Sequence, residues 1–255
     1  MSRQVGAWEV GAAVSQGFDI VYEKFFSTDT TDFAPIVSAL LATNPDVISL
    51  CEAWPEYQTL MWEQLYLQGF KGVVAQNYAD WETNLTKIPP EYPAARSAID
   101  SFPLMDDPWW GANSWQASFT RIWNKQYGPG APDDVHRRMT GIDWDHVVWF
   151  IPWCIGAQVA GKDTPGEWPS NDAILAALRK MSSFPTILGP GHMSGKEMFG
   201  IQNMIEQPVP MNMFDLKAND KRIIAHMNFE PWFEAIKPVV LKEVKKRGQH
   251  WTQRK

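Results

Sequence analysis

The chain has 255 residues, of which 45% are hydrophobic and 20% charged, a composition typical of a globular protein with one large domain or two smaller ones. Its formal net charge of −6 gives no support for a nucleic-acid surface or for binding to an anionic membrane. The two cysteines, Cys51 and Cys154, exclude a disulfide framework and a Cys-rich zinc motif, although one bridge between them stays possible.

The first part of the chain predicts strands that alternate with helices, joined by short connections. In chain order the elements are a weak helix at 8–17, a strand at 18–26, a helix at 33–41, a strand at 47–50, a helix at 55–68 and a strand at 73–75. Thr30, Thr31 or Asp32 can cap the second helix. Such alternation favours an α/β fold with a parallel sheet and right-handed crossovers.

The rest of the chain predicts helices followed by strands. In order we expect a possible strand at 101–105, helices at 112–127, 142–159 and 171–182, a Gly/Pro loop at 184–200, a strand at 201–207 and a hairpin at 209–227 that turns at about 218–220. Pro152 lies inside the second of these helices, so we expect a kink or a break there.

Aromatic residues are concentrated in the middle of the chain. Seven of the 14 Trp lie between residues 109 and 153, namely Trp109, Trp110, Trp115, Trp123, Trp144, Trp149 and Trp153. Packing in a core is the ordinary explanation for so many large aromatic side chains. The alternative is that some of them line a ligand cleft or a contact between subunits.

The sequence has no convincing motif for nucleophilic or nucleotide chemistry. Gly191 to Gly195 (GHMSG) does not have the G-x-S-x-G spacing that would make Ser194 a nucleophile. Lys196 lacks the glycine that a Walker loop needs before it, and no G-x-G-x-x-G follows a strand. We expect no bound cofactor.

The best metal-binding pattern is Asp143, Asp145 and His146. Asp143 and His146 are three residues apart and would share a helical face, but a zinc or iron site needs further ligands. Looser candidates are Asp106, Asp107, His136 and His192. The competing interpretation is that Asp143 and Asp145 cap the helix that they begin and interact with its dipole.

Polar and aromatic residues follow two of the predicted strands at the point where each strand ends. They are Glu52, Ala53 and Trp54 after the strand at 47–50, and Gln76, Asn77 and Tyr78 after the strand at 73–75. In open α/β sheets, ligands bind just outside the carboxyl ends of the parallel strands. A carboxylate, two amides and two aromatic rings at that edge are the groups that orient a small ligand against an apolar wall.

The run from Asp32 to Gly72 resembles the second lobe of type I periplasmic solute-binding proteins of the branched-chain amino acid class. It reads DFAPIVSALLATNPDVISLCEAWPEYQTLMWEQLYLQGFKG, and SWQASFTRIWNKQYG and ILGPGHMSGKEMFG resemble later family segments in the same order. The resemblance implies two α/β lobes that close on a small ligand. It also implies an ABC permease as partner, no catalysis, no membrane insertion, and a periplasmic or other extracytoplasmic location.

Carried over residue by residue, the resemblance assigns the pocket wall to the residues after the two strands. It adds Asp143 or Trp144 as groups that approach from the first lobe. The acidic residue with which the family holds a ligand amino group falls at Gln76 or Asn77 in this chain. That difference favours a neutral, aromatic or carboxylate-bearing solute over an α-amino acid.

The resemblance also divides the chain. It implies an α/β ligand-binding lobe at 8–105, a helical segment of the first lobe at 106–186, return strands and a hairpin at 187–230, and a C-terminal helix with a basic tail at 231–255. Most of the family's first lobe, with its export signal, has no counterpart here. We therefore expect a shortened protein, or association with a second copy that covers the aromatic helices.

Two other functions stay open at this point. A cytoplasmic ligand sensor on the same fold would explain the lack of an export signal, since no apolar run near Met1 has signal-peptide length. A hydrolase-like enzyme that uses Asp143 and His146 is the second alternative. The leading hypothesis is binding of an amino acid, amide or aromatic acid for uptake.

Overall fold

The computed structural model describes residues 2–50, 53–76, 87–96, 98–100, 114–127, 141–162, 165–215, 217 and 220–253. The chain folds into two compact units. Unit 1 comprises Met1–Phe102, Pro210–Ala225 and Pro231–Lys255, and unit 2 comprises Pro103–Val209 and His226–Glu230. Within the described ranges, no helix combines the length and the apolar character that crossing a membrane would require.

Unit 1 is built around the parallel strands that the sequence predicts. Its elements before residue 102 are α1 (Ser2–Ser15), α2 (Ala34–Leu41), β1 (Val47–Ser49), α3 (Pro55–Leu67), β2 (Val73–Gln76), the 3₁₀ helix η1 (Ala94–Arg96) and β3 (Ala98–Asp100). Its later elements are β7 (Pro208–Asp215), β8 (Asp220–Asn228), α9 (Phe229–Lys246) and the 3₁₀ helix η3 (Trp251–Gln253), of which β7, β8 and α9 each contribute some residues to unit 2.

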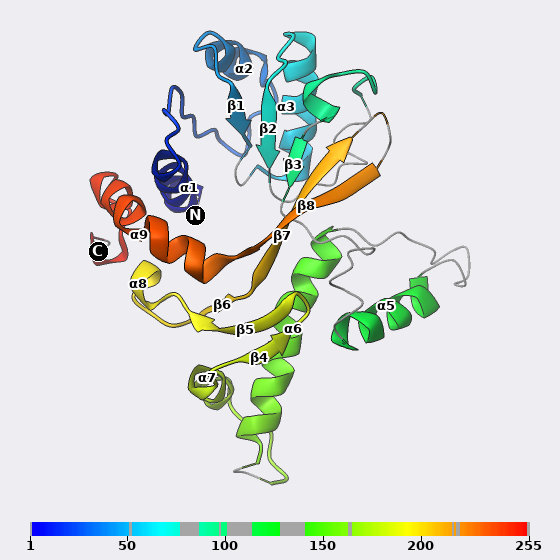
Figure 1. Cartoon of the computed structure of the whole chain (residues 1–255), viewed down its shortest axis with the longest axis vertical. Helices are drawn as coiled ribbons and strands as arrows, with labels where there is room; N and C mark the ends of the chain where they lie inside the picture. Colours follow the sequence, from blue (N-terminus) through cyan, green and yellow to red (C-terminus); the bar gives the residue numbers. More distant parts are fainter. Residues whose placement is uncertain are drawn as a thin grey trace. The chain divides into compact units, whose positions relative to one another are not determined.

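Five strands form the larger sheet, in the order β1-β2-β3-β7-β8 (Figure 1). β1 pairs with β2 in parallel, β2 with β3 in parallel, and β3 with β7 in antiparallel orientation. The helix α3 connects β1 to β2, as the crossover of a parallel pair requires. This confirms the α/β class with a parallel sheet.

The core of unit 1 lies where α2 and α3 pack on the sheet. Phe33 and Val37 at α2, Trp62 and Leu65 on α3, and Val74 of β2 are all buried in one cluster. Local sequence starts both helices: the Asp32 carboxylate accepts a hydrogen bond from the Ala34 backbone N–H at 3.0 Å, and Pro55 occupies the first turn of α3.

Unit 2 combines a small antiparallel sheet with helices. Its elements are α5 (Ser114–Tyr127), α6 (Gly141–Ala160), α7 (Asn171–Lys180), β4 (Phe184–Thr186), β5 (Gly189–Ser194), α8 (Lys196–Phe199) and β6 (Met204–Glu206). The sheet has the order β4-β5-β6. Ser170 is the N-cap residue of α7, and its side chain accepts a hydrogen bond from the Ala173 backbone N–H at 3.2 Å.

Several predicted elements are confirmed with small shifts in their ends. The helices predicted at 33–41, 55–68, 112–127, 142–159 and 171–182 correspond to α2, α3, α5, α6 and α7, and the hairpin corresponds to β7 and β8. The first helix begins six residues earlier than predicted, at Ser2. The possible strand at 101–105 lies outside the described residues.

Three predictions were wrong. Residues 18–26 form neither strand nor helix, and Phe18 and Val21 are exposed, because alternation makes a strand only where a neighbouring strand pairs with it. The predicted loop at 184–200 contains β4, β5 and α8. The break expected as one alternative at Pro152 does not occur, because α6 continues through this buried residue.

The misread loop has a local explanation. Gly195 and Gly200 adopt positive φ angles of 98° and 82° at the two ends of α8, so these glycines delimit an element and do not mark a loop. Gly191 lies inside β5, where a Cβ atom would come within 2.9 Å of the backbone oxygen of Glu206. Close approach of two strands is therefore the reason for that glycine.

Candidate functional site

The carboxyl ends of β1 and β2 lie at the same edge of the sheet in unit 1. Ser49 is in register with Ala75, and the Leu50 backbone N–H donates to the Ala75 carbonyl at 2.9 Å. Ala53 follows this point and Gln76 is the last residue of β2. The structure thus brings the two predicted segments together at one edge.

A buried side chain fixes the turn between β1 and α3. The Gln58 amide donates a hydrogen bond to the Ala53 carbonyl at 2.7 Å, and Gln58 is fully buried. Trp54 is the N-cap residue of α3 in an extended conformation, and its carbonyl accepts from the Gln58 backbone N–H at 3.0 Å. The Trp54 side chain is 69% exposed. Its ring is therefore presented to solvent by a rigid backbone.

Gln76 is held from the side of α3. Only 6% of its surface is exposed, and its Oε1 accepts a hydrogen bond from the Trp62 indole N–H at 2.8 Å. Its amide Nε2 has no hydrogen-bond partner among the described residues. A buried N–H group without a partner is costly, so a polar atom placed beside Gln76 Nε2 would be stabilised.

A row of polar residues crosses the sheet at this level. Gln76 of β2 is in register with Asp100 of β3, and Asp100 is in register with Asn212 of β7. Asn212 is 1% exposed, and neither its Oδ1 nor its Nδ2 has a hydrogen-bond partner within the described part of the chain. We call Gln76, Asp100 and Asn212 the polar row.

Sequence reasoning missed two members of the polar row. Asn212 has the same strand parity as the buried Phe214, so its position in VPMNMFD points to the core side of β7. A polar residue at an inward position was the available signal for Asn212. Asp100 had no such signal, because β3 itself was not predicted.

The remaining predicted residues are not brought into this site by anything that the structure describes. Glu52, Asn77 and Tyr78 lie outside the described residues. Asp143 and Trp144 lie on α6 in unit 2, but their side chains are outside the description. α6 begins at Gly141, so Asp143 is its third residue and not its N-cap. Cys154, also on α6, is a free thiol.

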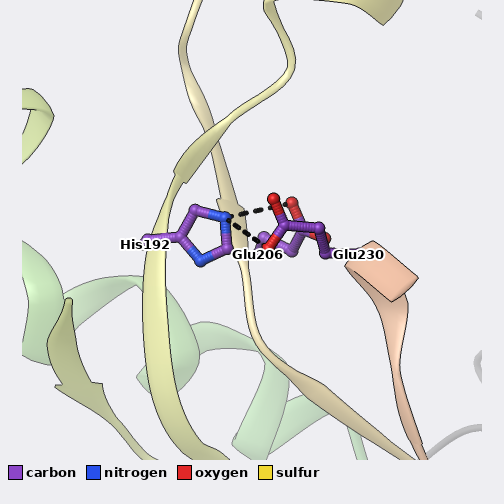
Figure 2. A group of neighbouring side chains, drawn as sticks. All are labelled: His192, Glu206 and Glu230. Carbon is purple, nitrogen blue, oxygen red and sulfur yellow. Dashed lines mark ion pairs between the residues drawn. The ribbon is translucent and has the colours of Figure 1, made fainter. Parts of the chain in front are cut away.

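A second polar cluster lies in unit 2. His192, Glu206 and Glu230 place one donor atom each within 4.8 Å of one another (Figure 2). His192 was one of the loose metal candidates in the sequence, whereas Glu206 and Glu230 were missed because both are distant from it along the chain. The side chains of Asp143, Asp145 and His146 are outside the description, so that pattern stays a prediction.

Unit 2 also has an apolar cavity of about 600 Å³. It is lined by Trp149, Phe150, Trp153, Leu175, Leu178, Met193, Asn203 and Ile205. Asn203 is the one polar residue among them, and its side-chain oxygen already accepts a hydrogen bond from Arg179. This cavity therefore offers apolar surface with little to orient a polar solute.

Comparison with solved structures identifies the fold. A leucine-binding protein from Thermotoga maritima matches with a TM-score of 0.58 and 15% identity, over 82% of this chain and 52% of its own. A leucine-, isoleucine-, valine-, threonine- and alanine-binding protein from Brucella ovis matches with a TM-score of 0.62 and 18% identity, over 87% of this chain and 53% of its own. A solute-binding protein of an ABC transporter from R. palustris, in complex with 4-hydroxybenzoate, matches with a TM-score of 0.56 and 13% identity, over 84% of this chain and 54% of its own.

No protein-family model matches the sequence, and no curated protein matches it. Each of these solved structures nevertheless matches more than four fifths of this chain, and all three share one fold. The chain spans about half the length of the structures that it matches.

Proposed function

We propose that this chain binds a small organic solute, without catalysis, as part of the substrate-binding component of an ABC-type uptake system. Its fold is that of type I periplasmic solute-binding proteins, as the resemblance in the sequence implied. The observation that carries the proposal is the polar row at the carboxyl edge of the parallel sheet, whose amide groups include atoms without a hydrogen-bond partner among the described residues. That edge is where open α/β sheets bind ligands.

The whole protein would then work outside the cytoplasm with an ABC permease. In this proposal unit 1 is the second lobe, unit 2 belongs to the first lobe, and Asp143 or Trp144 approaches the ligand from unit 2. The matched structures support the role in uptake, because they include two amino acid-binding proteins and a solute-binding protein of an ABC transporter.

The ligand class follows from the groups at the edge. Gln76 and Asn212 offer amide N–H donors, which suit a carboxylate or an amide oxygen, and Trp54 offers an exposed aromatic face. An ammonium group would need a carboxylate, and Gln76 supplies none. We therefore propose an aromatic acid, an amide or a similar carboxylate-bearing solute before an ordinary α-amino acid. The R. palustris protein that holds 4-hydroxybenzoate is an example of such binding on this fold.

The test is a thermal-shift screen of the 255-residue chain against amino acids, amides and aromatic acids. A solute that binds the native state raises the melting temperature. The best solute is then measured by calorimetry on the wild type and on Trp54→Ala. We expect Trp54→Ala to weaken binding at least about tenfold, as loss of an aromatic contact of about 1.4 kcal/mol would do.

Trp54→Ala should lower the stability of the chain only slightly, because the Trp54 side chain is largely exposed. Trp168→Ala is the matched control, since Trp168 is also exposed but lies in unit 2. Equal affinity of the wild type and Trp54→Ala, or an equal loss in Trp168→Ala, would contradict the site. A chain that no solute in the screen stabilises would contradict the proposed function.

A further inference from the structure

Two strands of unit 2 and the first turn of α9 place His192, Glu206 and Glu230 side by side. His192 on β5 is directly opposite Glu206 on β6 in the antiparallel register. Glu230 lies in the first turn of α9, within the short segment His226–Glu230 that belongs to unit 2. Figure 2 shows the imidazole of His192 facing both carboxylates. We call these three residues the His-Glu-Glu cluster.

The separations in the His-Glu-Glu cluster are those of ligands around a small cation. His192 Nε2 lies 3.4 Å from Glu206 Oε2 and 3.5 Å from Glu230 Oε2. Ordinary N–H···O hydrogen bonds are shorter, at about 2.7–3.2 Å. Two donors on a tetrahedral zinc ion with bonds of about 2.0–2.1 Å are separated by about 3.4 Å. The His192 nitrogen therefore lies at a ligand-to-ligand distance from each carboxylate, and all three donor atoms lie within 4.8 Å of one another.

The charge of the cluster also favours a cation. Glu206 and Glu230 bring two carboxylates to one imidazole. Only 8% of the Glu206 side chain is exposed, and a cation is a favourable neighbour for a buried carboxylate. The helix N-terminus at Glu230 contributes only a partial charge. A divalent ion would neutralise both carboxylates at once.

We propose that the His-Glu-Glu cluster binds one divalent transition-metal ion, with zinc as the preferred species. The ligands are Nε2 of His192 and one oxygen each of Glu206 and Glu230, a nitrogen and oxygen set that suits zinc. Glu230 is 60% exposed, so the site opens toward solvent on its side. A fourth position there would hold a water molecule or a small anion. This site is separate from the polar row of unit 1 and does not depend on the solute proposed there.

The experiment uses the full chain, freed of metal by a chelator and titrated with zinc by calorimetry. We expect one zinc ion per chain and a melting temperature that rises with zinc. His192→Ala and Glu230→Gln should each weaken zinc binding by more than about tenfold, the least that even an outer-shell change produces. Cobalt(II) in place of zinc should give the strong visible bands of a four-coordinate ion, which the variants lose.

Matched controls separate the site from unspecific binding. Glu234→Gln changes an exposed carboxylate on the same helix, one turn after Glu230, and His226→Ala changes another histidine of unit 2. Both should bind zinc like the wild type. Glu230 is mostly exposed, so Glu230→Gln should fold even if Glu206 variants do not. A wild type that binds no zinc, or variants that bind it as tightly, would show an ion pair only and overturn the proposal.

Discussion

Individual buried polar residues carry much of what is specific to unit 1. The Gln58 amide closes the turn that presents Trp54, and the Gln76 oxygen accepts from Trp62. Each of these hydrogen bonds satisfies a group that burial would otherwise penalise. Tyr92 differs from them, because its buried hydroxyl has no hydrogen-bond partner among the described residues.

Tyr92 predicts a loss of stability at alkaline pH. Burial raises the pKa of its hydroxyl above the ordinary value. Between the unfolded pKa of about 10 and the higher folded value, the unfolded state releases a proton that the folded state keeps. The contribution of the protonated Tyr92 to the free energy of unfolding is thus complete below about pH 10. Above that pH it falls by up to about 1.4 kcal/mol per pH unit.

Tyr92→Phe tests this directly. The ring contacts with Trp62 and Tyr66, at centroid distances of 6.3 and 5.3 Å, remain in the variant. We expect equal or slightly higher stability at neutral pH and a shallower decline above pH 10, measured by urea unfolding at several pH values. Lysines titrate in both proteins, so the difference between the two curves is the measure. Parallel curves would show that Tyr92 is not the group responsible.

Among the elements, α1 and α9 approach each other closely in unit 1 (Figure 1). A Cβ atom on Gly11 of α1 would lie 2.9 Å from the Cα atom and 3.2 Å from the carbonyl oxygen of Val240 on α9. Backbone atoms cannot yield without a shift of the whole helix. Gly11 therefore permits this packing distance, at the expense of helix propensity.

We expect Gly11→Ala to destabilise the chain by about 1–3 kcal/mol, because overpacking outweighs the gain of about 1 kcal/mol in helix propensity. Gly6→Ala on the same helix is the control. Its new methyl group would meet only the ring of Phe25, at 3.2 Å, and a half-buried side chain can move. That variant should be neutral or stabilising in thermal unfolding. A rise in the melting temperature of both variants would contradict the close approach of α1 and α9 at Gly11.

The elements also show where prediction from sequence succeeds. Apolar periodicity and capping are local signals, so α2, α3 and α7 were predicted within two residues of their ends. The sheet of unit 2 was not, because β4, β5 and β6 depend on pairing between segments rich in Gly and Pro. At the edge of the sheet in unit 1, Trp54 and Gln76 followed from the strand ends, whereas Asn212 comes from a distant part of the chain. The His-Glu-Glu cluster of unit 2 was not predicted as a group, because Glu206 and Glu230 are distant from His192 along the chain.

At the scale of the whole molecule, unit 2 keeps a large apolar surface in contact with solvent. Phe150 is 62% exposed and Trp149 is also exposed, and both line the apolar cavity. Trp168 and Ile122 are exposed elsewhere in unit 2. Exposed apolar surface on this scale is typical of a surface that another protein covers. A second copy of the chain remains our expectation, as it was from the aromatic helices in the sequence.

Sedimentation of the wild type should therefore show association that increases with concentration, together with binding of an apolar dye. Phe150→Ser should reduce both, because Phe150 lines the cavity and is mostly exposed. Leu67→Ser is the control, since Leu67 is equally exposed but lies in unit 1. A monomer at every concentration, with no dye bound, would contradict the expectation.

The division of unit 1 in the sequence has a consequence for how the chain is made. Its sheet needs β7, and its N-terminal helix packs on α9, yet all of Pro103–Val209 is synthesised in between. Glu23 and Arg247, which form an ion pair, are 224 residues apart. On the ribosome, the side of α1 that packs on α9 therefore stays uncovered until α9 has been synthesised. Most of unit 2, made without interruption, can fold while unit 1 is still unfinished.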